Sequence, residues 1–338
     1  MIVFHHPGQR AHDPQFFLSS GAPKPCPEQP ARIDALLSGV HSLGLTVKTP
    51  QDQGLDAIVA IHPARYLTFL QTIHDRWQHI PGASAEVIPN IHPANRTDGY
   101  PLSAVGQAGF HMTDTSCPIG AQTWDAAYLS TQSAIAGADA ILTGARAAYA
   151  LCRPPGHHAF AELAGGFCYL NNAAIAAQQL TLSGRKVAIL DIDVHHGNGT
   201  QGIFYDRADV LTVSLHAHPE RFYPFFWGYP SELGVGEGTG TNLNICLPRG
   251  TPDADYLTAL QQALEAISRW GADTLVLALG LDAYVGDPFK GFAITTPGFA
   301  KIGAAIAATG LPTLIVQEGG YLAPELGQNL AAVLGAFL

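Results

Sequence analysis

The second half of the chain alternates between short apolar runs and amphipathic stretches. The apolar runs predict five strands, at Ala148–Arg153 and near residues 186–192, 210–216, 274–281 and 313–317. Patterns with a helical period lie between or after these runs, at Asn171–Leu182 and near residues 255–269, 297–309 and 322–337. This order predicts an α/β fold, a three-layer α/β/α domain in which helices cover both faces of a mostly parallel central sheet.

The first half of the chain is less regular. Ile2–Phe4 predicts an opening strand, and helical patterns follow near residues 31–43, 63–79 and 122–137. Two segments rich in Pro and Gly, at about 5–30 and 80–121, predict long ordered loops. Long loops in compact domains are commonly functional, so we interpret residues 1–338 as a single domain that carries these two segments as insertions.

Composition and charge narrow the classes of ligand. The 338 residues are 47% hydrophobic and carry a net charge of -10 without any run of Lys and Arg, so we expect no nucleic-acid partner. An acidic chain suits small cations such as polyamines. The five cysteines show no C-x-x-C spacing, which argues against a disulfide framework or a zinc ribbon. No signal peptide or membrane-length apolar stretch is visible, so we expect a cytoplasmic protein without membrane association.

Polar residues follow the predicted strands at the point where each strand ends. In parallel sheets, ligands gather outside the carboxyl ends of the strands, so these residues are expected to meet at one rim. The five segments are Cys152–His158, Asp191–His196, Ser214–His218, Gly280–Asp282 and Gln317–Tyr321.

The segment Asp191–Asn198 places two carboxylates and two imidazoles directly behind an apolar run. If the strand continues through Asp193, its period of two puts Asp191, Asp193 and His195 on one face. Asp193 and His195, joined by Asp282 from another strand end, match the three protein ligands of a catalytic Zn²⁺, and manganese or iron could also be accommodated. His196 points the other way, and we interpret it as structural.

Two further segments supply residues suited to catalysis. His157 and His158 follow Pro-Pro-Gly, a stiff mount that suits a general base, and Asp191 and Asn198 could each accept a ring N–H and fix the tautomer. Tyr321 follows two glycines, and its phenol could stabilise a developing oxyanion beside a metal.

These segments together resemble the arginase/deacetylase superfamily, specifically the zinc-dependent histone-deacetylase-like amidohydrolases, and among them the bacterial acetylpolyamine amidohydrolases. Arg32 stands where that family keeps an arginine near an inner cavity. The matching segments run in family order and are Arg153–His158, Gly165–Asn172, Asp191–Gln201, Ser214–His216, Gly280–Asp282 with Asp287-Pro288, and Glu318–Tyr321. Phe225–Tyr229 and the glycine-rich Gly234–Gly240 are more similar to the polyamine branch than to the histone branch.

The resemblance implies roles for individual residues. It implies that Asp193, His195 and Asp282 bind Zn²⁺, that His158 is the general base and acid, and that His157 gives electrostatic support. Tyr321 would polarise the amide carbonyl. Phe167 and Tyr223 would wall a tunnel in which the Gly166 carbonyl faces the substrate amide N–H.

The resemblance also implies bound monovalent ions and an assembly. A structural K⁺ or Na⁺ would lie near Asp191, Asp193, His195, Ser214 and Leu215, and a second near the backbone carbonyls of Phe204, Arg207 and Val210. A homodimer is suggested, with residues 80–121 narrowing the partner's entrance, although a monomer with a self-covering loop would have the same sequence pattern.

One position departs from the acetylpolyamine pattern. Where those enzymes have a glutamate in a mid-chain loop, this chain has Ser116. A carboxylate at the tunnel mouth would attract the distal ammonium of a polyamine. The candidates for that carboxylate are Asp114, Glu162, Asp98 and Glu220, and each could equally be a solvated surface acid.

The function expected from these residues is hydrolysis of acetylated polyamines or short acetylamides to acetate and a free amine. The main alternative is a protein acetyl-lysine deacetylase, which would require an open tunnel rim. An arginase-like ureohydrolase with two Mn²⁺ is disfavoured because His196 and Asn198 stand where the second metal needs aspartates. A catalytically silent small-amide binding protein is a further alternative.

Overall fold

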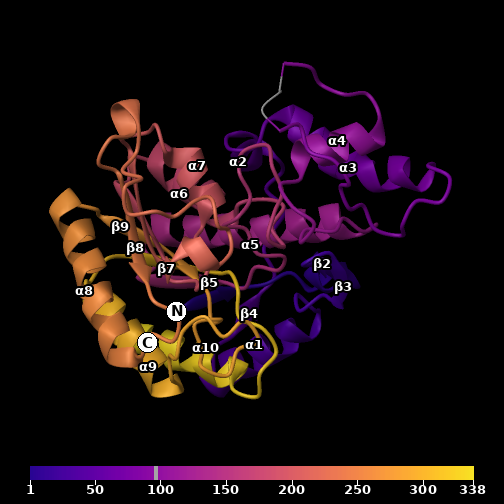
Figure 1. Cartoon of the computed structure of the whole chain (residues 1–338). Coiled ribbons are helices and arrows are strands. Elements are labelled where there is room, and N and C mark those ends of the chain that lie inside the picture. The colour runs from indigo at the N-terminus through magenta and orange to yellow at the C-terminus, as the bar shows by residue number, and fades with distance from the viewer. Residues whose placement is uncertain (95–97) are drawn as a thin grey trace.

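A computed structural model describes residues 1–94 and 98–338 of the chain (Figure 1). Its centre is an eight-stranded sheet with the order β4-β1-β5-β10-β9-β6-β7-β8. The ladders between neighbouring strands of this sheet are all parallel. The strands are β1 (Ile2–Phe4), β4 (Val47–Lys48), β5 (Ala147–Ala150), β6 (Val187–Asp191), β7 (Val210–Ala217), β8 (Asn242–Leu247), β9 (Thr274–Leu279) and β10 (Thr313–Gln317).

Helices cover both faces of the sheet, which confirms the predicted three layers. One layer contains α5 (Thr123–Leu142), α6 (Asn172–Leu182) and α7 (Asn198–Phe204). The opposite layer contains α1 (Ala31–Ser42), which is indigo in Figure 1, and α8 (Asp253–Trp270), α9 (Thr296–Ala307) and α10 (Leu326–Leu334), which are orange to yellow. Successive residues of β6 divide between the two layers, since Ile189 packs in the core under α5 and α6 and Leu190 in the core under α8.

Three helices extend the layer that contains α5. They are α2 (Asp56–Val59), α3 (Ala64–Gln78) and α4 (Ala104–His111). Ser103 caps α4 by accepting a hydrogen bond from the Gly106 N–H. Tyr66, Phe69 and Leu70 of α3 are buried in the same core as α5.

The two segments expected to be long loops are more structured than predicted. Residues 5–30 contain a short 3₁₀ helix, Pro7–Ala11, and an antiparallel hairpin of β2 (Phe16–Ser19) and β3 (Ala22–Pro25). The 80–121 segment contains α4. Strand β5 ends at Ala150 and not at Arg153, and α10 is shorter than residues 322–337.

Along the described residues, the helices are all too short or too polar to cross a membrane. The five cysteines, which all lie in described parts of the chain, are free.

Candidate active site

The carboxyl ends of β5, β6, β9 and β10 carry the polar residues of the site, as predicted. The prediction that β6 continues through Asp193 is wrong, because the strand ends at Asp191. The following turn is held by side chains: the Asp193 N–H donates to Asp191 Oδ1 at 3.0 Å, and the His195 N–H donates to Asp193 Oδ1 at 2.9 Å. The turn separates Asp191 from Asp193 and His195.

Asp193, His195 and Asp282 form a buried cluster in which one ligand atom of each lies within 4.8 Å of the others. His195 Nδ1 is 3.1 Å from both Asp193 Oδ1 and Asp282 Oδ2. The remaining oxygens are anchored by backbone, since Asp193 Oδ2 accepts from the Gly319 N–H at 2.8 Å and Asp282 Oδ1 from the Val194 N–H at 3.0 Å.

The charges of this cluster fit a metal ion. Burial and the neighbouring Asp193 carboxylate raise the pKa of Asp282 to about 6, although His195 opposes the shift. Two buried carboxylates are costly without a positive partner. Two oxygens and one imidazole nitrogen are a donor set that Zn²⁺ and related divalent cations accept. The three residues therefore fit the predicted divalent metal.

The two adjacent histidines have different partners, as predicted. His157 Nδ1 lies 2.9 Å from Asp191 Oδ2, and His158 Nδ1 lies 2.7 Å from Asn198 Oδ1. An amide oxygen only accepts, so Nδ1 of His158 carries the proton and Nε2 is left with a lone pair.

Burial and neighbouring charged groups set the charges of the two rings. Burial disfavours the cation of His157, but the carboxylates of Asp191 and Asp193 outweigh this effect and raise its pKa to about 10. Burial and the two neighbouring histidines hold the pKa of His158 well below its usual value. A cationic His157 thus lies beside a neutral His158 that can accept a proton.

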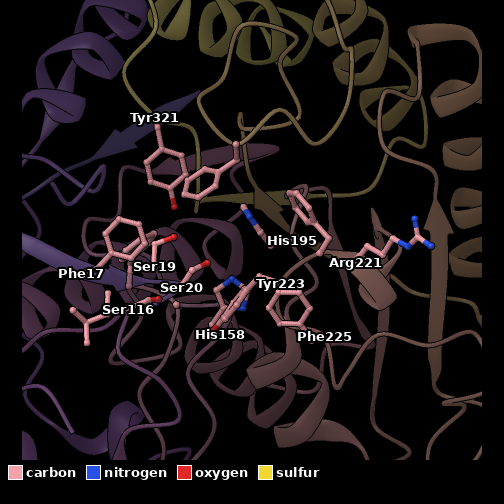
Figure 2. Close-up of a pocket in the computed structure, with 15 residues that line it drawn as sticks. Phe17, Ser19, Ser20, Ser116, His158, His195, Arg221, Tyr223, Phe225 and Tyr321 are labelled. Carbon is pink, nitrogen blue, oxygen red and sulfur yellow. The ribbon is translucent and has the colours of Figure 1, made fainter. Parts of the chain in front are cut away.

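Tyr321 is held beside the cluster by the loop that follows β10. Its N–H donates to Asp287 Oδ2 at 3.0 Å, and its ring packs on Phe289 with centroids 4.8 Å apart. The Arg32 guanidinium lies over the Tyr321 ring, 4.9 Å from its centroid. Figure 2 shows the Tyr321 hydroxyl directed toward the space in front of His195 and His158.

A cavity of about 360 Å³ leads to these residues, with His158, His195 and Tyr321 at its inner end. Six aromatic side chains line its wall, namely Phe17, Phe167, Phe222, Tyr223, Phe225 and Phe289. Gly166 also lines it and has φ of 51°. A Cβ at Gly166 would lie 2.4 Å from His158 Cδ2, so only glycine allows the wall to approach His158 this closely.

The acidic residues considered for the tunnel mouth do not line the cavity. Asp114 Oδ2 accepts from the Tyr223 hydroxyl at 2.6 Å and from the Gly166 N–H at 3.2 Å, so this half-buried carboxylate is bonded to two residues of the cavity wall. Glu162 pairs with Arg65 outside the cavity. Asp98 and Glu220 are exposed and also lie outside it. Asp114 thus adjoins the cavity wall and Glu162 lies outside the cavity, and the substrate-binding roles predicted for both stay predictions.

His196 and the residues predicted to hold monovalent cations lie behind the site. His196 Nδ1 is 3.1 Å from Ser214 Oγ, and its ring packs on His216. A cavity of about 10 Å³ is lined by Asp191, His196 and Ser214 among others. Leu215 follows Ser214 in β7, while Phe204, Arg207 and Val210 lie between the end of α7 and the start of β7. Both cation sites stay predictions.

A network of buried charged residues positions the site; Glu28 was missed from the sequence, and the contacts of Arg32, Arg153 and Glu318 were not predicted. Glu318 Oε2 accepts from the N–H groups of Gly156 at 2.6 Å and His157 at 3.0 Å. Buried Glu28 Oε1 accepts from Arg32 at 2.7 Å and from Arg153 at 2.9 Å. Arg32 also donates to the carbonyls of Glu318 and Gly320. The four-residue spacing of Glu28 and Arg32 is visible in the sequence, but their partners are up to 288 positions away.

Phe17, Ser19 and Ser20 are a second omission. They reach the cavity because the β2–β3 hairpin packs against the loop that contains Thr115, with the Leu18 N–H donating to the Thr115 carbonyl at 3.5 Å. The expectation that residues 5–30 contribute to function identified the segment but not these side chains.

Comparisons with known proteins agree with this geometry. A model of the histone deacetylase domain matches residues 26–337. The chain is 46% identical to an acetylpolyamine amidohydrolase of Burkholderia pseudomallei, over 100% of this chain and 98% of that protein. It is 45% identical to an acetylpolyamine amidohydrolase of Mycoplana ramosa, over 91% of each. Histone deacetylase 8 of Arabidopsis thaliana is 38% identical over 66% of this chain.

Solved structures show the same similarity. The crystal structure of the acetylpolyamine aminohydrolase from Burkholderia pseudomallei superposes with a TM-score of 0.96, covering 100% of this chain and 98% of that chain at 46% identity. The HDA15 HD domain superposes with a TM-score of 0.83 at 27% identity, covering 100% of this chain and 90% of that one.

Proposed function

Since the chain belongs to the histone deacetylase domain family, we propose that it is a zinc-dependent amidohydrolase that removes acetyl groups from acetylated polyamines or related short acetylamides. One observation carries this proposal: three residues that fit a metal ion, a neutral histidine and a tyrosine hydroxyl meet at the inner end of one aromatic cavity. The names of the full-length relatives support the polyamine substrate.

Asp193, His195 and Asp282 would hold the metal, which we propose is Zn²⁺, with Fe²⁺ or Mn²⁺ as alternatives. When bound, such an ion polarises a carbonyl and acidifies water. The monovalent ions predicted near Asp191 and near Phe204 would have structural roles.

The chain's own residues would perform the proton transfers. His158 Nε2 takes a proton from the attacking water as the new carbon–oxygen bond forms, and gives it to the amine nitrogen as the carbon–nitrogen bond breaks. Asn198 keeps His158 in the required tautomer. Tyr321 donates a hydrogen bond to the carbonyl oxygen as negative charge builds on it, and the cationic His157, held by Asp191, adds electrostatic stabilisation.

The cavity would orient the substrate for this reaction. Its aromatic wall suits a linear alkyl chain and excludes bulk water from the reacting centre. Phe167 and Tyr223 would flank the chain, and the Gly166 carbonyl would accept the amide N–H. The products would be acetate and a free amine.

Metal analysis and an acetate-release assay test this function. The substrates are acetylputrescine, acetylcadaverine, acetylspermidine and an acetyl-lysine peptide. We expect bound zinc and acetate from the small amides. Acetate from the peptide alone would favour the protein deacetylase, zinc without acetate would favour a silent binding protein, and the absence of both would overturn the proposal.

The remaining proposals concern the location, the domain organisation and the oligomeric state of the protein. We propose that the chain acts in the cytoplasm as a single domain and forms a homodimer in which residues 80–121 narrow the partner's entrance. Sedimentation equilibrium measures the mass directly, and a monomer at all concentrations would contradict the dimer.

A further inference from the structure

The tyrosine beside the metal cluster is mounted on a pair of glycines. Tyr321 follows Gly319 and Gly320, and Gly320 has a φ of 110°, a backbone conformation that favours glycine. A Cβ at Gly320 would also lie 2.7 Å from the Leu281 Cβ. Glycines leave a backbone free to move, whereas a group that stabilises a transition state must be held to within about 0.5 Å. The fold therefore needs contacts that fix Tyr321 itself.

The carboxylate of Asp287 supplies such contacts. Its Oδ2 accepts a hydrogen bond from the Tyr321 N–H at 3.0 Å, and its Oδ1 accepts one from the Phe289 N–H at 2.8 Å. These N–H groups belong to the loops that follow β10 and β9, so one side chain joins the two loops. Asp287 is only 2% exposed, and burial strengthens both hydrogen bonds by excluding water from them.

The backbone of Asp287 is itself held in a closed turn. Its N–H donates to the Tyr284 carbonyl at 3.0 Å, and its carbonyl accepts from the Lys290 N–H at 3.1 Å. The same loop is closed further along by the Val285 N–H, which donates to the Ile294 carbonyl at 2.9 Å. Asp287 is thus a fixed point against which the loop after β10 is aligned.

The hydrogen bond to Phe289 adds a second restraint on Tyr321. The Phe289 ring packs on the Tyr321 ring with centroids 4.8 Å apart, and on the His195 ring with centroids 5.1 Å apart. By fixing the Phe289 backbone, Asp287 positions a ring that contacts both the tyrosine and a residue of the metal cluster. One carboxylate therefore restrains both the backbone and the ring of Tyr321.

Resting on the proposed function, we propose that Asp287 is a positioning residue that aligns the Tyr321 hydroxyl with the amide carbonyl of the substrate. The role requires a carboxylate, because both of its oxygens accept, whereas an amide of the same shape offers one oxygen and one NH₂ group. Asp287 belongs neither to the three residues of the metal cluster nor to those that line the cavity, so it acts through Tyr321 and not on the substrate.

The substitution Asp287→Asn tests this role in the zinc-loaded full chain. It keeps the size of the side chain but turns an NH₂ group toward one of the two backbone N–H groups. We expect kcat for acetylputrescine to fall by about tenfold or more, because a small displacement of the hydroxyl weakens it as an oxyanion donor, while KM and the bound zinc change by less than about twofold. An unchanged kcat, or loss of zinc, overturns the proposal.

A double-mutant cycle with Tyr321→Phe identifies the residue through which Asp287 acts. The Asp287 carboxylate also interacts electrostatically with Asp282 and His195, and an effect through these residues would persist without the tyrosine hydroxyl. In the Tyr321→Phe background we therefore expect Asp287→Asn to change kcat by less than about twofold. Equal losses in the two backgrounds overturn the proposal.

Asp253→Asn is the matched control. The Asp253 carboxylate also accepts two hydrogen bonds from a separate segment, from the Thr295 N–H at 2.9 Å and from the Thr295 hydroxyl at 2.6 Å, and it lies outside the cavity. This variant should keep the kcat of the wild type, and a tenfold loss would show that joining two segments explains the effect without Tyr321. If chemical denaturation shows that Asp287→Asn does not fold, Asp287→Ser, which retains one acceptor in a smaller side chain, takes its place in the cycle with the same criteria.

The outcome separates this proposal from the proposed function. If the zinc-loaded wild type releases no acetate, the deacetylase activity is contradicted, and the role of Asp287 with it. Activity in the wild type together with equal losses in the two backgrounds leaves the deacetylase in place and removes only the positioning role of Asp287.

Discussion

Burial and neighbouring charges decide the protonation of the histidines in this chain, and hydrogen bonds fix their tautomers. His157 and His158 are adjacent, yet the carboxylates of Asp191 and Asp193 make His157 cationic, while burial and the neighbouring histidines keep His158 neutral. The same principle applies away from the site at His62, which donates from Nδ1 to the Ala161 carbonyl and accepts at Nε2 from the Asn171 N–H, both at 2.9 Å. Protonation of His62 would break the second bond.

The hydroxyl of Tyr321 should matter for catalysis and not for metal binding. Tyr321→Phe is expected to lower kcat by about 100-fold or more, as for loss of one oxyanion donor, while bound zinc is unchanged. Steady-state kinetics and metal analysis on the same preparation measure both. Tyr205→Phe, outside the cavity, is the matched control. Loss of zinc from Tyr321→Phe would mean that this residue supports the metal site.

The buried His62 should make stability depend on pH. Burial lowers its pKa to about 4, against about 6.5 in an unfolded chain. Between these pH values the unfolded state binds more protons than the folded state. The contribution of His62 to the free energy of unfolding is therefore complete above about pH 6.5 and is lost as the pH falls toward 4. The loss is on the order of 3 kcal/mol for a group buried this deeply.

Chemical unfolding at a series of pH values measures this dependence. His62→Gln keeps a donor and an acceptor but does not titrate, so the slope near pH 5 should fall by about 1 kcal/mol per pH unit. His41→Gln, at an exposed position, should keep the wild-type slope. An unchanged slope in His62→Gln would show that His62 does not resist protonation.

Residue spacing made the centre of the site predictable. Asp193, His195 and Asp282 follow the ends of apolar strands, and His157 and His158 follow Pro-Pro-Gly, so a rule about strand ends was sufficient to bring them together. The mouth was not predictable in this way. Asp114 was one of four candidate carboxylates for the tunnel mouth, and its contact with Tyr223, 109 positions later, does not follow from local spacing.

At the scale of elements, buried strands were easier to predict than edge strands. The apolar runs of β6, β9 and β10 are covered on both faces, so their hydrophobicity is continuous. Edge strand β8 alternates Asn242, Leu243, Asn244 and Ile245, and β4 has two residues, so neither forms an apolar run. The hairpin of β2 and β3 contains two prolines, which the sequence pattern assigns to loop.

The contact between α1 and α10 is controlled by two glycines. A Cβ on Gly39 would lie 2.2 Å from the Gly327 carbonyl oxygen, so the helices can touch only without it. Gly39→Ala should destabilise the protein by about 1–2 kcal/mol, because overpacking outweighs the better helix propensity of alanine. Chemical denaturation measures the change. Ser38→Ala, exposed on the same helix, should change the free energy of unfolding by less than about 0.5 kcal/mol, and an equal result for both variants would contradict the close contact.

At the scale of the whole molecule, the three layers followed from the order of strands and helices. Asp193 and His195 follow β6, and Asp282 follows β9. An ion bound by these three residues would therefore link parts of the sheet that are distant in sequence. The order of strands and helices did not predict the network of Glu28, Arg32 and Arg153. The partners of these buried charges are brought together only by tertiary packing.

Metal binding should therefore stabilise the entire fold. Zn²⁺ at 100 times its Kd should add about 2.7 kcal/mol and raise the Tm. Differential scanning calorimetry with and without a chelator measures the shift. Asp282→Asn removes one of the two cluster carboxylates and should reduce the shift strongly, whereas Asp273→Asn, outside the cluster, should retain it. A full shift in Asp282→Asn would place the ion elsewhere.

The position of β10 has a consequence for how the protein is made. This strand is the last of the sheet to be synthesised, yet it lies between β5 and β9. A nascent chain that has not reached Thr313 holds β4, β1 and β5 in one group and β9, β6, β7 and β8 in another, each with an apolar edge that has no neighbour. Unpaired strand edges can pair with strands of other chains and so promote aggregation. The two half-sheets of the new protein therefore need protection until β10 joins them.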